Sequence, residues 1–238
     1  MTRFTSFVPV TAALVLMVAP ALRAESASDR LQEAATVLEE VMQAGDKGIP
    51  TDLLERAHCV VIVPGVKKLA LGVGGKYGRG FSVCRTADHK AWGAPAAVRM
   101  EGGSIGWQIG GSESDVILLV MTETGARRLL DSKFTLDANA GVAAGPVGRT
   151  AQASTDAKLT AGILSYSRSR GLFAGLSVGG ATLRNDLDEN KELYGKEMTN
   201  KQIVAQNVAP PETAGRLISA LTKYSRTEAG GAERTRKP

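Results

Sequence analysis

Hydrophobic positions recur with a helical period near both ends of the chain and with a strand period through its middle. Over residues 29–43 the apolar positions are three and four apart, which predicts an amphipathic helix. A short second helix is expected over residues 52–57, and another over residues 124–132. Helical patterns return over residues 200–207 and 211–224.

Strands are predicted where β-branched and apolar runs are bounded by glycine or proline. These runs occupy residues 59–63, 69–73, 80–84, 96–100, 104–109, 115–122, 160–167 and 171–183. The Pro64-Gly65 pair predicts a turn, and the glycines of residues 72–80 predict a hairpin. Residues 115–122 are apolar at almost every position, which is typical of a central strand covered on both faces.

Several of these strands carry one apolar face and one nearly bare face. In residues 104–110, for example, Ile105, Trp107 and Ile109 alternate with Gly106 and Gly110. A bare face permits a tight bend or the close approach of another backbone. We therefore predict an α+β fold with a curved, glycine-rich antiparallel β-sheet that could close toward a barrel, and with helices from both chain ends packed on it.

The N-terminal residues have the layout of a secretory signal peptide. Arg3 precedes an apolar run over residues 7–22, and small residues stand before possible cleavage sites after Ala21 and Ala24. A transmembrane anchor is the alternative, but the run is short and contains prolines. We expect a signal peptide at 1–24, one domain at 25–225, a disordered basic tail at 226–238, and export to the periplasm.

The net charge of +5 comes largely from the two ends of the chain. Residues 25–225 are nearly neutral, so the composition does not support a nucleic-acid-binding protein. An anionic partner would have to meet a local group of cations.

Three short basic segments could form such a group. Lys67 and Lys68 follow the predicted Pro64-Gly65 turn, and Lys76 and Arg79 lie in the next glycine-rich segment. Arg168 and Arg170 form the third segment, before Gly171. If these segments meet at one rim of the sheet, the six side chains would bind anionic phospholipid. The alternative is that all six are ordinary solvated charges.

The chain has two cysteines, Cys59 and Cys84. Export would place them in an oxidising compartment, where one disulfide is expected if the strands that carry them pair antiparallel. Two buried free thiols are the first alternative. A zinc site that adds His58 and His89 is the second, although the spacing matches no usual ligand pair.

Motifs for enzymatic activity fail on order or spacing. Ser104 and Ser177 each lie in a Gly-x-Ser-x-Gly match, but no histidine follows His89, and both serines lie in strand patterns. The glycines of residues 72–80 do not fit a nucleotide-binding loop. The carboxylates at Asp186, Asp188 and Glu189 are interpreted as a solvated turn. We therefore expect no enzymatic activity, no metal and no cofactor.

The order of the glycine-rich segments resembles the SYLF family. The resemblance covers about residues 31–204 and rests on CVVIVPGVKKLALGVGGKYGRG, WGAPAAVRMEGGSIGWQIGG, DVILLVMT, AGVAAGPVGR, ILSYSRSRGLFAGLSVGGATLRND and NKELYG. It implies a non-enzymatic domain that binds membrane lipids, with phosphoinositides and actin as partners of eukaryotic members.

Two functions remain open from the sequence. The first is an anionic-phospholipid-binding protein of the bacterial cell envelope. The second is a structural or stress-related periplasmic protein that binds another protein and no lipid. Actin binding is not expected outside the cytoplasm.

Overall fold

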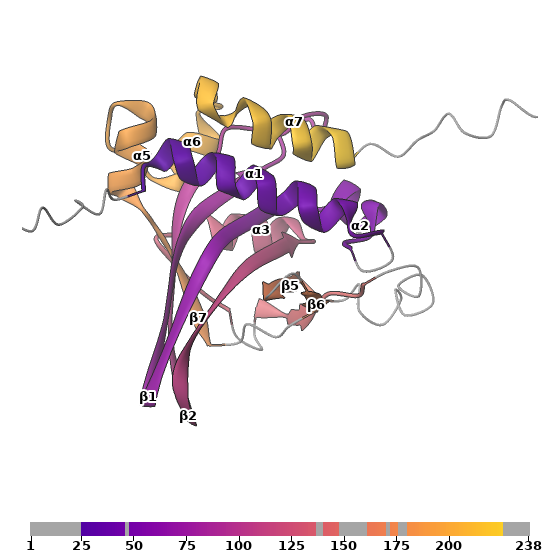
Figure 1. Cartoon of the computed structure of the whole chain (residues 1–238). Helices are drawn as coiled ribbons and strands as arrows, with labels where there is room; N and C mark the ends of the chain where they lie inside the picture. Colours follow the sequence, from indigo (N-terminus) through magenta and orange to yellow (C-terminus); the bar gives the residue numbers. More distant parts are fainter. Residues whose placement is uncertain are drawn as a thin grey trace, which may run out of the picture.

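The computed structural model describes residues 25–45, 48–136, 140–147, 161–169, 172–175 and 180–225, without the side chains of 69–73, 104–110 and 172–175. The predicted signal peptide and basic tail lie outside the described residues. A curled sheet is covered on one side by helices from both ends of the chain, as predicted (Figure 1). The elements are α1 (Ala27–Gln43), α2 (Thr51–Arg56), β1 (Cys59–Cys84), β2 (Ala96–Val120), α3 (Glu123–Leu129), β3 (Lys133–Leu136), β4 (Val142–Ala144), β5 (Ile163–Ser169), β6 (Leu172–Gly175), β7 (Ala181–Asn185), α5 (Leu187–Tyr194), α6 (Asn200–Ala205), a 3-10 turn (Glu212–Ala214) and α7 (Gly215–Tyr224).

The centre of the sheet is a long antiparallel ribbon made of β1 and β2. The ladder runs from the pair Cys59 and Val120 to the pair Ser82 and Ala96. The turn predicted at Pro64-Gly65 and the hairpin predicted over residues 72–80 are therefore wrong. Gly65 instead lies in an irregularity of the ladder, with φ +54°. Its backbone N–H donates to Asp115 Oδ1 at 2.9 Å, so β1 continues through the proline as one strand.

The two ends of β1 come together because the strand bends back on itself. The Arg85 N–H donates to His58 O at 2.8 Å, and Cys59 is disulfide-bonded to Cys84. A side chain at Gly80 would place its Cβ 2.1 Å from Ile62 O. The predicted disulfide is thus confirmed, and its cysteines belong to the two halves of one folded strand.

The bend also divides β2 between two parts of the sheet. Residues 98–102 of β2 pair with β7, which pairs in turn with β3. Residues 115–120 pair with β5, which also contacts β4 and β6. Within the described residues only the β4–β5 pair is parallel. The sheet is therefore almost wholly antiparallel and curls around the ribbon.

Residues alternate between two apolar cores along the central strands. On β2, Ile117 and Leu119 pack with α1, α2 and α7, whereas Leu118 and Val120 face the opposite core with residues of α3 and β3. Each of these four side chains is buried. The prediction that residues 115–122 form a central strand covered on both faces is confirmed.

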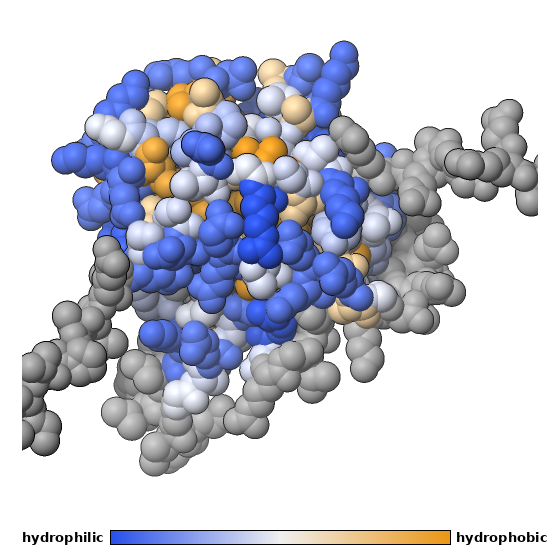
Figure 2. Space-filling view, turned by 45° about the horizontal axis from the view of Figure 1, so that its top comes forward, coloured by the Kyte–Doolittle hydropathy of each residue, from blue (hydrophilic) through white to orange (hydrophobic). Residues whose placement is uncertain are grey.

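Helices from the two ends of the described chain pack against each other on the first core. Leu31 and Leu38 of α1 share this core with Leu217 and Leu221 of α7. At the margin, the Gln32 side-chain amide donates to Thr213 O at 2.9 Å. The helical side of the molecule carries mostly hydrophilic side chains, with hydrophobic ones scattered in small groups (Figure 2).

The close approach at Gly80 makes this position sensitive to a single methyl group. Gly80→Ala should lower the free energy of unfolding by about 2–3 kcal/mol, because the new Cβ meets backbone atoms that cannot rotate away. Gly103→Ala on β2 is the matched control, since a Cβ there meets no atom within 4 Å. Urea unfolding of both variants measures the difference. Equal stability of the two variants would contradict the prediction.

Loss of the disulfide should also destabilise the fold. The cysteines are 25 positions apart, and a loop of this size corresponds to about 3–4 kcal/mol in the chain-entropy model. The double variant Cys59→Ala, Cys84→Ala should lose about this much free energy of unfolding. Adding a reductant to the parent should have a similar effect and should leave the double variant unchanged. A parent protein whose unfolding is insensitive to reductant would refute the argument.

Candidate functional site

The fold of β1 brings together basic residues that are far apart in the sequence. Lys67 and Lys68 lie on its first half, and Lys76 and Arg79 on its second half. Burial and then the charge of Lys68 lower the pKa of Lys76, so the two ammonium groups are close enough to repel. Lys67 and Arg79 line one pocket with Tyr77. The structure therefore brings four of the six predicted residues together in two pairs, Lys67 with Arg79 and Lys68 with Lys76.

Tyr77 lines the same pocket as Lys67 and Arg79 and is itself exposed. Its side chain is 48% exposed. In the described part of the chain it is the one large hydrophobic side chain that is exposed. A tyrosine has an apolar ring and a polar hydroxyl, a combination that suits the boundary between water and lipid. Lys67 and Lys68 are exposed on the same strand, and Lys76 is half-buried. We call Lys67, Lys68, Lys76 and Tyr77 the β1 basic surface.

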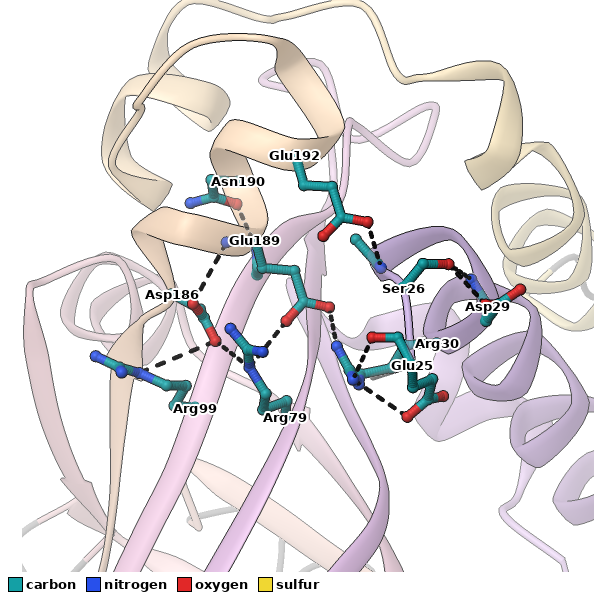
Figure 3. Close-up of polar contacts among 12 residues, drawn as sticks. Glu25, Ser26, Asp29, Arg30, Arg79, Arg99, Asp186, Glu189, Asn190 and Glu192 are labelled. Carbon is teal, nitrogen blue, oxygen red and sulfur yellow. Dashed lines mark hydrogen bonds and ion pairs between the residues drawn. The ribbon is translucent and has the colours of Figure 1, made fainter. Parts of the chain in front are cut away.

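Arg79 differs from the lysines because it belongs to an internal ion-pair network (Figure 3). Its Nε lies 2.6 Å from Asp186 Oδ2 and 3.2 Å from Glu189 Oε2. The hydrogen bond to Asp186 is the main reason why the pKa of Arg79 is raised. Arg30 of α1 also pairs with Glu189. Arg79 thus links the sheet to α1 and α5, and its guanidinium is already neutralised.

The network corrects the interpretation of Asp186 and Glu189 as part of a solvated turn, whereas Asp188 is exposed as expected, on helix α5. Asp186 caps α5, where its side chain accepts from the Glu189 N–H, and both carboxylates are almost fully buried. Asn190 extends the contacts, because its Oδ1 accepts from the Ala97 N–H at 2.8 Å. The helix pattern of residues 187–194 was missed because its buried positions are charged or polar.

Arg168 and Arg170 are the remaining predicted cations. Arg168 lies on β5, where its Nε is 2.5 Å from Asp115 Oδ2, and it also pairs with Glu40 of α1. Burial is the main reason why the pKa of Arg168 is lowered. It therefore helps to hold α1 on the sheet. Arg170 lies outside the described residues.

A pocket of about 300 Å³ lies next to the β1 basic surface. Its wall carries both signs of charge, from Arg30, Lys67 and Arg79 and from Glu25, Glu33 and Glu113. The partial burial of Glu33 at this pocket and the neighbouring carboxylate of Glu25 raise its pKa to about 7. These carboxylates were not among the predicted site residues, because only the fold places α1 beside the bend of β1.

The other motifs have the following positions. Ser104 lies within strand β2, opposite Gly74, and its side chain is outside the described part; Ser177 is wholly outside it.

The predicted zinc site with His58, Cys59, Cys84 and His89 as its four ligands is wrong, because the two sulfurs are bonded to each other. Among the described residues, no group of three or more His, Cys, Asp or Glu side chains is placed to hold a metal ion. No described helix has the length and apolar character needed to cross a membrane.

These features define the class of protein: an α+β domain whose sheet curls around one long two-stranded ribbon, with helices from both chain ends on one side. A family model described as "Ysc84: Las17-binding protein actin regulator" matches residues 101–224. The chain belongs to this family, which confirms the resemblance found in the sequence motifs.

Relatives from yeast and mammals match most of this chain. LAS seventeen-binding protein 3 of Saccharomyces cerevisiae is 33% identical over 179 residues, which cover 74% of this chain and 39% of the relative. Protein YSC84 of the same yeast is 32% identical, over 82% of this chain and 43% of the relative. The human SH3 domain-containing YSC84-like protein 1 is 28% identical, over 82% of this chain and 58% of the relative. The match spans roughly two fifths to three fifths of these longer proteins.

The raised pKa of Glu33 predicts a pH-dependent effect of its removal. Glu33 ionises near 4.5 ordinarily and near 7 in the fold, so the parent loses stability as the pH rises through this window. Glu33→Gln should therefore increase the free energy of unfolding at pH 8 and leave it nearly unchanged below the window. Since the side chain is largely exposed, screening limits the gain to about 1 kcal/mol or less.

Denaturant unfolding on both sides of this pH window measures the effect. Glu197→Gln removes the same charge from an exposed position that does not line the pocket. A gain that is equal for both variants, or equal at both pH values, would show that the environment of Glu33 is not responsible.

Proposed function

We propose that this domain binds anionic phospholipid at a membrane surface through the β1 basic surface, and that it acts without catalysis. The observation that carries the proposal is the gathering of lysines on the folded strand β1, where Lys67 lines a pocket with the exposed Tyr77 and Lys68 lies near Lys76. The domain as a whole is nearly neutral, so attraction to a membrane requires such a local group.

The magnitudes are sufficient for reversible membrane association. Each lysine near an anionic bilayer contributes on the order of 1 kcal/mol, and the effect falls off within a Debye length. Three lysines would thus give weak binding that depends on salt, and the ring of Tyr77 would add contact at the interface. The pattern of residues 1–24 supports an exported protein that meets the lipids of the bacterial envelope from the periplasm.

Binding to another protein is the second candidate function. The relatives named for binding LAS seventeen and the family description as an actin regulator support it. The pocket beside the β1 basic surface also favours it, because Glu25, Glu33 and Glu113 could pair with basic residues of a partner. We place this function second, since the exported location that we propose would separate the domain from actin.

Vesicle co-sedimentation tests the lipid-binding proposal. The triple variant Lys67→Gln, Lys68→Gln, Lys76→Gln should bind phosphatidylglycerol or cardiolipin vesicles at least tenfold more weakly than the parent, because up to about 3 kcal/mol of attraction is removed. Raised salt should weaken the parent in the same direction. Arg79 is left in place because its ion pairs hold the fold together.

The matched control is Lys191→Gln, Lys196→Gln, Lys201→Gln, which removes three exposed charges at α5, α6 and the segment between them. This control should bind vesicles nearly as well as the parent. Equal weakening of both triple variants would show that net charge matters and the β1 basic surface does not. A parent that binds no bilayer would favour the protein-partner function.

A further inference from the structure

The two histidines of this chain lie side by side, although 31 positions separate them in the sequence. The ring centres of His58 and His89 are 5.1 Å apart, and the ring planes are nearly perpendicular, at 84°. His58 is half-buried and His89 is exposed. Neither histidine is among the residues of the β1 basic surface, so the pair is a separate feature.

The backbone holds both residues in place. The His58 N–H donates to Val120 O at 2.8 Å, and His58 O accepts from the Arg85 N–H at the same distance. The neighbouring disulfide ties the strand ends on which these contacts depend. Residue 58 is therefore fixed where β1 begins, at the point where the strand returns to itself.

His89 is held by the turn that joins β1 to β2. Its N–H donates to Thr86 O at 2.8 Å, and Asp88 is bound within the same turn by the Thr86 hydroxyl at 2.6 Å. The φ angle of His89 is +57°, in the left-handed region that is uncommon for residues other than glycine. Such strain is often found at functional positions, and here it places the imidazole beside His58.

The 5.1 Å between the ring centres is the separation expected for two imidazoles on one metal ion, and it also suits an edge-to-face ring contact. Zinc binds imidazole nitrogen at about 2.0–2.1 Å, so two rings on a tetrahedral ion have centres roughly 5 Å apart. Imidazole is a preferred ligand of zinc and copper, and copper(II) binds most tightly among the divalent ions of this series. We propose that His58 and His89 together bind one copper(II) or zinc(II) ion, with water completing the coordination.

The surroundings limit which other groups could ligate the ion and carry charges of both signs. Cys59 and Cys84 cannot ligate the ion, because they are bonded to each other. The guanidinium of Arg85 lies 4.3 Å from the centre of the Trp92 ring and donates to the carbonyl oxygens of Glu55, Ala57 and His89. Its positive charge opposes a bound cation, whereas the carboxylate of Glu123, which also pairs with Arg127, acts on His58 with the opposite sign.

Metal titration of the disulfide-bonded protein tests the proposal. The protein should carry no histidine tag, and zinc(II) and copper(II) should be titrated separately by calorimetry. We expect one ion per chain at this site and a rise in the melting temperature with metal concentration, because the ligand binds the folded state. The copper(II) resonance spectrum should show nitrogen hyperfine structure from two imidazoles.

Two single variants separate this site from any other. His89→Asn keeps a residue that tolerates the left-handed backbone, and His58→Gln keeps a polar side chain at the half-buried position. Either one should weaken binding at least tenfold and remove the two-nitrogen signature, while circular dichroism and melting without metal confirm that the variant folds. Binding that is unchanged in both folded variants, or a parent that binds neither ion, would overturn the proposal.

Discussion

The contact of β1 with itself is the constraint on which the rest of the structure depends. Gly78 and Gly80 have no side chain to separate them from the strand's first half, and the disulfide fixes the two ends. The same bend places Lys68 near Lys76, brings His58 to His89, and forms one wall of the pocket beside α1. A shorter or straighter strand would separate the members of all three groups.

A second constraint is the buried ion-pair network that joins α1, β1 and α5. Removing charges such as Glu189 from water is costly, and their attraction repays this cost only if every partner is present. Arg30 of α1 and Arg79 of β1 supply the positive charges that pair with Glu189. The network therefore ties α1 and α5 to the sheet at defined positions. It also accounts for Arg79, which would otherwise be grouped with the exposed lysines.

The sequence predicted features that depend on local periodicity and missed those that depend on distant partners. The two-sided burial of residues 115–122 and the helices at both ends follow from the spacing of apolar residues. The continuity of β1 was missed because glycine and proline signal a turn in an isolated segment, whereas the ladder with β2 resumes at Val66 after the irregularity at Gly65. Helix α5 was missed because the partners of Glu189 lie more than a hundred positions away. The lysines were expected to meet at turns, whereas the structure places Lys68 near Lys76 through the bend of one continuous strand.

The packing of α1 against α7 has a consequence for the order in which the molecule can form. The first apolar core contains Leu31 from the beginning of the domain and Leu221 from its end. A growing polypeptide cannot complete this core until its last helix has left the ribosome. The hydrophobic interior on this side of the sheet is consequently finished only when both ends of the domain are present.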